Sequence, residues 1–157
     1  MAQGDVVFFN QFLEDEADKL HNLSTDDLYL GLITSAATPA ATSSDPRWGT
    51  GGSTNFSTNE VSGTGGNYPA DGVNMSVTIT DGISRTGGTV DLLADNVSIA
   101  QHASNPTDAR WGIIYNYTAA GKQCVGFVDL GADSDLTSGP FSITWSGTNV
   151  ISAKTQA

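Results

Sequence analysis

Cysteine is nearly absent from this sequence. The 157 residues include a single cysteine, Cys124. One thiol cannot form a disulfide within the chain, and it cannot build a multi-cysteine metal site. A chain of this length buries roughly 70% of the surface that its unfolded form exposes. We therefore expect a single domain over residues 1–157 that is stabilised by packing alone, without a disulfide or a metal.

Basic side chains are also few. Six Lys and Arg residues stand against seventeen Asp and Glu residues, which gives a formal net charge of -11 at pH 7. This charge repels nucleic-acid phosphates and anionic lipid headgroups, so neither nucleic acid nor a membrane surface is an expected partner. The charge favours solubility, and it can also steer the chain onto a basic patch of another protein.

Long apolar runs are missing as well. No stretch approaches the roughly 20 apolar residues of a membrane-spanning helix. The residues before Phe8 include the acidic Asp5, where a signal peptide would carry basic residues. We expect a soluble protein with no signal peptide.

The first helix is predicted over residues 5–21. Apolar residues recur there at spacings of three and four, with acidic residues between them, and Asp5 can cap the first turn. Phe8 and Phe12 widen the apolar stripe. Two interpretations remain open: the stripe packs on the domain's own sheet, or it docks on a neighbouring subunit.

A glycine-rich loop is predicted over residues 35–72. It follows a period-two pattern at residues 28–33 that is typical of a strand. Loops of this length are commonly functional or disordered, and scattered large side chains favour a loop that is pinned at intervals. Trp48 either anchors this loop in the core or offers its ring to a sugar or a partner pocket.

The second half, residues 73–151, is predicted to be rich in strands. Strand patterns cover residues 73–80, 89–93, 96–100, 110–116, 124–130 and 141–146, and the dipeptides Asp81-Gly82 and Gly87-Gly88 bracket a hairpin-like piece. Residues 110–116 are apolar or aromatic on both faces, as in a central strand. The predicted fold is mainly β, an antiparallel β-sandwich or jelly-roll-like domain with one N-terminal helix.

Residues with catalytic potential are sparse. His21 is assigned to the end of the predicted helix, His102 to a polar turn, and Cys124 to a buried strand position. The glycines at 63–66 lack the Lys-Ser/Thr of a phosphate-binding loop, and Asp129, Asp133 and Asp135 lack the spacing of a calcium loop. We expect no enzymatic activity, no cofactor and no metal. The candidate partner contacts are Phe8, Phe12, Trp48 and Phe56.

Five segments, in chain order, resemble a family of phage virion proteins of the head-decoration, auxiliary-capsid or minor structural kind. The family's D-x-L-x-V-A-L-x-T-S-A phrase is similar to DLYLGLITSA at residues 27–36, and its N-E-V-x-G-T-G phrase is similar to residues 59–65. Its A-R-Y-x-x-I-Y-N, G-x-x-D-F-G and G-x-F-x-I-x-W phrases are similar to residues 109–116, 126–131 and 139–145.

The resemblance implies a non-enzymatic protein of the virion, assembled in the bacterial cytoplasm. The implied role is a decoration or cement protein on the outer surface of the head, in homo-oligomeric form, with the major capsid protein or other virion proteins as partners. A tail or fibre component is one alternative. A carbohydrate-binding knob that holds a host glycan is another, and Trp48 would be its contact residue.

Overall fold

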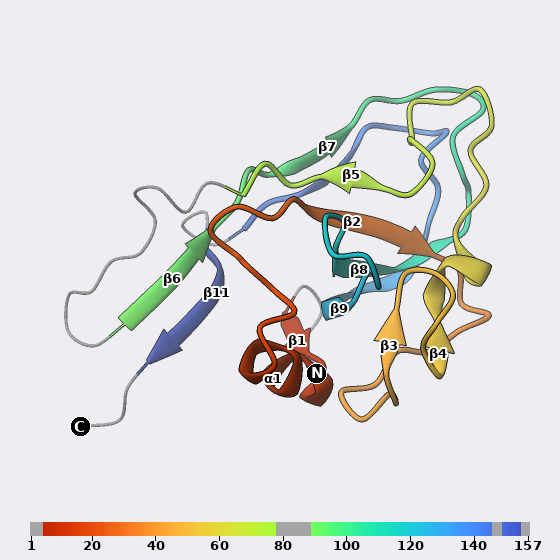
Figure 1. Ribbon diagram of the computed structural model, residues 1–157. Helices are drawn as coiled ribbons and strands as arrows, with labels where there is room; N and C mark the ends of the chain where they lie inside the picture. The colour runs from red at the N-terminus through yellow and green to blue at the C-terminus, as the bar shows by residue number, and fades with distance from the viewer. Residues whose placement is uncertain (1–4, 78–88, 146–148, 155–157) are drawn as a thin grey trace.

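The centre of the protein is a five-stranded antiparallel sheet (Figure 1). The computed structural model describes residues 5–77, 89–145 and 149–154. In sheet order the strands are β1 (Val6–Phe8), β9 (Cys124–Ser134), β8 (Ala109–Asn116), β2 (Leu28–Ile33) and β5 (Val73–Asn74). The mainly β prediction is confirmed, and β8 takes the central position expected of it.

Both faces of this sheet are covered. Leu28, Leu30 and Leu32 of β2 point to one face, where they cluster with residues of a second small sheet. That sheet pairs β7 (Val97–Ile99) with β10 (Phe141–Ile143) in antiparallel register. The pairing of two apolar sheet faces gives a sandwich-like arrangement. Ile33 of β2 lies in a separate apolar cluster with β8 and β9 side chains.

The glycine-rich loop over residues 35–72 covers this second cluster. It contains two short parallel strands, β3 (Pro46–Arg47) and β4 (Thr54–Asn55), and a 3-10 turn, η1 (Phe56–Asn59). Trp48 and Phe56 are part of the cluster, while Val61 and Tyr68, further along the loop, are buried in the first one. Four buried side chains therefore hold the segment against the sheet at intervals along its length.

The predicted helix over residues 5–21 is wrong in its extent. Residues Val6–Phe8 form β1 and pair with Gly126, Phe127 and Val128 of β9, and only Asn10–Ala17 form the helix α1. Phe9 occupies the N-cap and makes no side-chain cap, so Asp5 does not cap the helix. β-branched Val6 and Val7 favour a strand, and pairing with β9 satisfies backbone groups that a helix start would leave open.

Several strand boundaries also differ. β5 ends at Asn74, because Ser76 adopts a positive φ of 46° that breaks the extended backbone. β9 runs four residues past its predicted end, to Ser134, and β10 stops at Ile143. Residues 78–80 and the hairpin-like piece at 81–88 lie outside the described residues. β6 (Thr89–Leu93) pairs with β11 (Asn149–Lys154) in a ribbon that extends away from the central sheet (Figure 1).

Candidate functional site

The four predicted partner contacts lie within the fold. Trp48 and Phe56 expose 1% and 2% of their surface, and Phe12 exposes 7%. Phe8 is half-buried and stacks on Phe12 at 5.6 Å between ring centroids. Phe56 stacks on Phe9 at the same distance. The structure shows Trp48 as an anchor of the loop in the core, because its ring stacks on Tyr115 at 5.0 Å between ring centroids.

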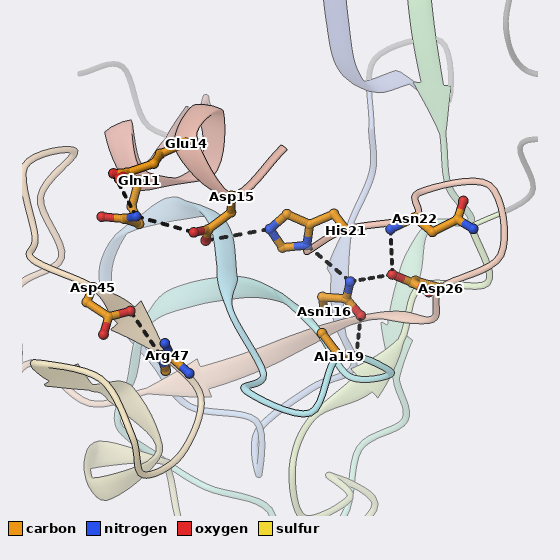
Figure 2. A network of polar contacts seen from close by, with 10 residues as sticks. All are labelled: Gln11, Glu14, Asp15, His21, Asn22, Asp26, Asp45, Arg47, Asn116 and Ala119. Carbon is orange, nitrogen blue, oxygen red and sulfur yellow. Dashed lines mark hydrogen bonds and ion pairs between the residues drawn. The ribbon is translucent and has the colours of Figure 1, made fainter. Parts of the chain in front are cut away.

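A buried polar network joins the helix to the central strand (Figure 2). The Nδ2 of Asn116, at the end of β8, donates to His21 Nδ1 at 3.1 Å and to Asp26 Oδ2 at 2.6 Å. Asn116 Oδ1 accepts from the backbone N–H of Ala119, which fixes the amide orientation. Asp15 of α1 approaches from the other side, with Oδ2 at 3.8 Å from His21 Nε2. The hydrogen bonds of Asn116 therefore tie the segment before β2 to β8, and Asp15 places α1 beside them.

The ring of His21 is neutral in this arrangement. An amide N–H can only donate, so Nδ1 must accept and the proton must sit on Nε2. That Nε2 is buried and finds no hydrogen-bond partner among the described residues, because 3.8 Å to Asp15 is too long for one. Burial lowers the pKa of His21, and the carboxylates of Asp15 and Asp26 act in the opposite direction. With no exposed side-chain surface, this histidine is a packing group and not an accessible base.

A second cluster opens to solvent along the glycine-rich loop. A cleft of about 530 Å³ runs beside Glu60, Tyr68 and the glycines at 63–66. Tyr68 accepts from the Leu32 backbone N–H and donates to Glu60 Oε1, both at 2.9 Å. Burial raises the pKa of Tyr68, and burial also raises the pKa of Glu60. The pair holds the loop to β2 through buried, mutually satisfied groups.

An adjoining cavity of about 260 Å³ contains an ion pair. Lys122 Nζ lies 3.6 Å from Asp71 Oδ1, which also accepts from Trp48 Nε1 at 3.2 Å. The backbone of Asp71 lies close to the Glu60 carboxylate and acts to lower its pKa, and Ser57 lines both cavities. The two hollows are therefore neighbours that meet at Ser57, and we call them together the Asp71–Lys122 cleft.

The remaining sequence candidates are dispersed. Cys124 is fully buried, and burial raises its pKa well above the ordinary value, so it is a small apolar side chain in β9. His102 is exposed in a turn, where Nδ1 accepts from the Ser104 backbone N–H. Asp129 pairs with Arg110, and Asp135 accepts from Thr137 in its own turn. Their hydrogen bonds lower the pKa of both carboxyls.

In the described parts of the chain, no group of three or more His, Cys, Asp or Glu side chains is placed to hold a metal ion. Nor does any helix among those residues have the length and apolarity to cross a membrane. No protein-family model, curated protein or solved structure matches the chain.

Sequence reasoning missed both polar clusters. Asn116 and His21 lie 95 positions apart, and Trp48 and Asp71 lie 23 apart. A pattern search over short windows cannot bring such residues together. The Asp71-Gly72 pair is a local signal for a turn, because this dipeptide favours positive φ. It gave no indication that the carboxylate would meet Trp48 and Lys122.

Proposed function

We propose that this chain is a non-enzymatic structural protein of a phage particle, a decoration protein that binds the outer surface of the head. The proposal rests first on the resemblance of five segments to phage virion proteins. Three of these segments, 27–36, 109–116 and 126–131, contain β2, β8 and part of β9. These are neighbouring strands of the central sheet, although β2 lies about 75 residues before β8 and β9.

The observation that carries the proposal is the location of these similar segments on neighbouring strands. Phrases matched by chance would fall anywhere in the fold, whereas these describe one continuous piece of scaffold. The segment at 59–65 joins the same scaffold, since Glu60 forms a β-bridge with Ile33. The last segment, 139–145, contains β10 of the facing sheet. A resemblance concentrated on the framework supports a shared fold, and the structural role is proposed by analogy with the family it resembles.

The charge of the chain is consistent with this role. A net charge of -11 favours solubility and favours a basic surface as the partner. A carbohydrate-binding knob built on Trp48 has less support, because that ring is covered by the protein itself. No feature of the fold favours a tail or fibre position over the head.

The test is quantitative mass spectrometry of purified particles, followed by a reconstruction of the particle at a resolution that shows the domain. We expect a copy number that follows the symmetry of the head, and density on the outer shell. Particles that lack the chain would sink the proposal. Density confined to the tail would replace it with the fibre alternative.

A further inference from the structure

The larger hollow of the Asp71–Lys122 cleft has the size of a small-ligand site, and the smaller one adds to it. Its two hollows measure about 260 and 530 Å³ and share Ser57 as a wall. Ligand pockets in proteins commonly occupy about 300–1,000 Å³. Glycines and hydroxyl side chains make up much of the walls, so more polar than apolar surface faces the space.

The ion pair leaves hydrogen-bonding capacity unused. Asp71 Oδ1 accepts from Trp48 Nε1, while Oδ2 accepts no hydrogen bond from the described part of the chain. Lys122 Nζ contacts Asp71 at 3.6 Å and lies 4.8 Å from the centroid of the Tyr117 ring, and an ammonium group has three donors. The side chains of Asp71 and Lys122 are 48% and 31% exposed. A carboxylate acceptor and an ammonium donor are thus presented side by side to an incoming group.

Both residues are held in an uncommon backbone conformation. Asp71 has φ 68° and Lys122 has φ 45°, in the left-handed region that non-glycine residues rarely adopt. The surroundings fix them there. Tyr115 Oη donates to the Asp71 carbonyl at 2.5 Å, and the Lys122 carbonyl accepts from the Trp48 backbone N–H at 2.9 Å. The acceptor and donor are therefore preorganised, which reduces the entropy lost when a ligand binds.

The charges select the class of ligand. Asp71 and Glu60, together with the overall charge of -11, disfavour an anion. Lys122 disfavours a cation at the same point. A hydroxyl group can donate to Asp71 and accept from Lys122 at once, and adjacent hydroxyls can do both. Tyr117, which is 40% exposed and stacked on Tyr29, adds an aromatic edge beside Lys122.

We propose that the Asp71–Lys122 cleft binds a neutral polyhydroxylated ligand of the saccharide class. Asp71 and Lys122 would hold adjacent hydroxyls, and Ser57 and Glu60 would line the space that a second sugar ring occupies. The inference does not depend on a place in a phage particle, and it uses Trp48 as a donor that fixes Asp71 instead of as a stacking surface.

The test is to titrate the isotope-labelled full chain with sugars and to monitor the backbone amide chemical shifts by NMR. The probes are glucose, galactose, mannose, N-acetylglucosamine and their disaccharides, with glucose 6-phosphate as the anionic comparator. At least one neutral sugar should shift the amides around residues 71 and 122, and the phosphate should bind more weakly. Asp71→Asn and Lys122→Asn should each lower the affinity at least about tenfold, because Asn accepts the left-handed backbone but removes the charge.

The chain supplies matched controls. Asp45 and Lys19 also have positive φ, at 39° and 60°, and neither lines the cleft. Asp45→Asn and Lys19→Asn should leave the affinity unchanged. The proposal is overturned if no neutral sugar shifts these amides, or if the control variants lose as much affinity as the cleft variants. Particle location is measured separately, so failure here leaves the structural role unaffected.

Discussion

Gly31 is the residue that lets the glycine-rich loop close onto the sheet. It lies in β2 beneath the indole of Trp48, and a Cβ built at this position would overlap that ring. Trp48 cannot retreat, since Tyr115 stacks on it at 5.0 Å. Elsewhere in a strand, alanine is the better residue by roughly 0.5–1 kcal/mol. Here the overlap dominates, so we expect Gly31→Ala to lower the free energy of unfolding by about 1–3 kcal/mol.

Urea unfolding followed by tryptophan fluorescence measures this effect. Gly139→Ala is the control, because a Cβ there would have no heavy atom of the described chain within 4 Å beyond its two chain neighbours, and its φ is not positive. That variant should unfold at the urea concentration of the parent. Equal midpoints for the two variants would show that the indole does not sit over Gly31.

His21 makes stability depend on pH in a defined window. Burial lowers its pKa in the folded state, so on acidification the unfolded chain takes up the proton first, near its ordinary pKa of about 6.5. The free energy of unfolding should therefore fall as the pH drops from about 7 through 6.5, until the folded-state pKa is also passed. A proton on Nδ1 would also face the Asn116 amide donor. Each unit by which the two pKa values differ corresponds to about 1.4 kcal/mol.

His21→Gln and His102→Gln separate this effect from other titrations. The raised pKa values of Glu16 and Glu60 act with the opposite sign on acidification, and they are common to both variants. Unfolding curves at about pH 7.5 and 5.5 should show the loss of stability in His102→Gln and not in His21→Gln. An unchanged pH dependence in His21→Gln would exclude the buried ring as its cause.

At the scale of elements, Phe9 lies between β1 and α1 and anchors the N-terminal segment in the core. Phe9 is fully buried, it contacts Phe127 and Phe56 at 5.2 and 5.6 Å between centroids, and its N–H donates to the Val125 carbonyl at 3.1 Å. Phe9→Ala should lower the free energy of unfolding by about 3–5 kcal/mol. Leu13→Ala, on the same helix but 72% exposed, should change it by less than about 0.5 kcal/mol.

Denaturant unfolding of both variants tests whether the segment belongs to the domain core. A small effect of Phe9→Ala would mean that β1 and α1 pack elsewhere, such as on a neighbouring subunit, which was the second interpretation of the apolar stripe.

Local patterns predicted those elements whose period is unambiguous. The leucines of β2 alternate without interruption, and β8 is apolar on both faces, so each was placed correctly. The prediction for the N-terminal segment was wrong because its pattern is ambiguous. Val6 and Phe9 have a helical spacing, whereas Val6 and Phe8 have the spacing of a strand. The partner that decides between the two is β9, more than a hundred residues away.

The polar clusters were less accessible to prediction than the strands. Asp71 meets Lys122 only because the loop ending at Gly72 folds back over the turn between β8 and β9. Backbone conformation also matters here: nothing in the sequence distinguishes Lys122, with its positive φ, from an ordinary turn lysine. Hydrophobic spacing indicates which face of a strand or helix is buried. A contact such as the Asp71–Lys122 ion pair depends on how the whole chain folds.

For the whole molecule, charge is the dominant long-range property. Seventeen acidic and six basic residues repel one another on balance, and this repulsion opposes the compact state. Salt screens exposed charges, with a Debye length that falls from about 30 Å at 0.01 M to about 3 Å at 1 M. The same screening weakens attraction to a basic partner surface. Folding and assembly should therefore respond to salt in opposite directions.

We expect sodium chloride between about 0.01 and 1 M to raise the free energy of unfolding of the isolated chain and to weaken its binding to phage heads that lack it. Thermal unfolding and co-sedimentation with such heads, each as a function of salt, measure the two effects. A variant that replaces exposed Asp108 and Asp133 with Asn should show smaller salt effects in both measurements, because neither carboxylate forms an ion pair with the described residues. Binding that strengthens with salt would instead indicate an apolar contact with the shell, and the acidic surface would then serve solubility alone.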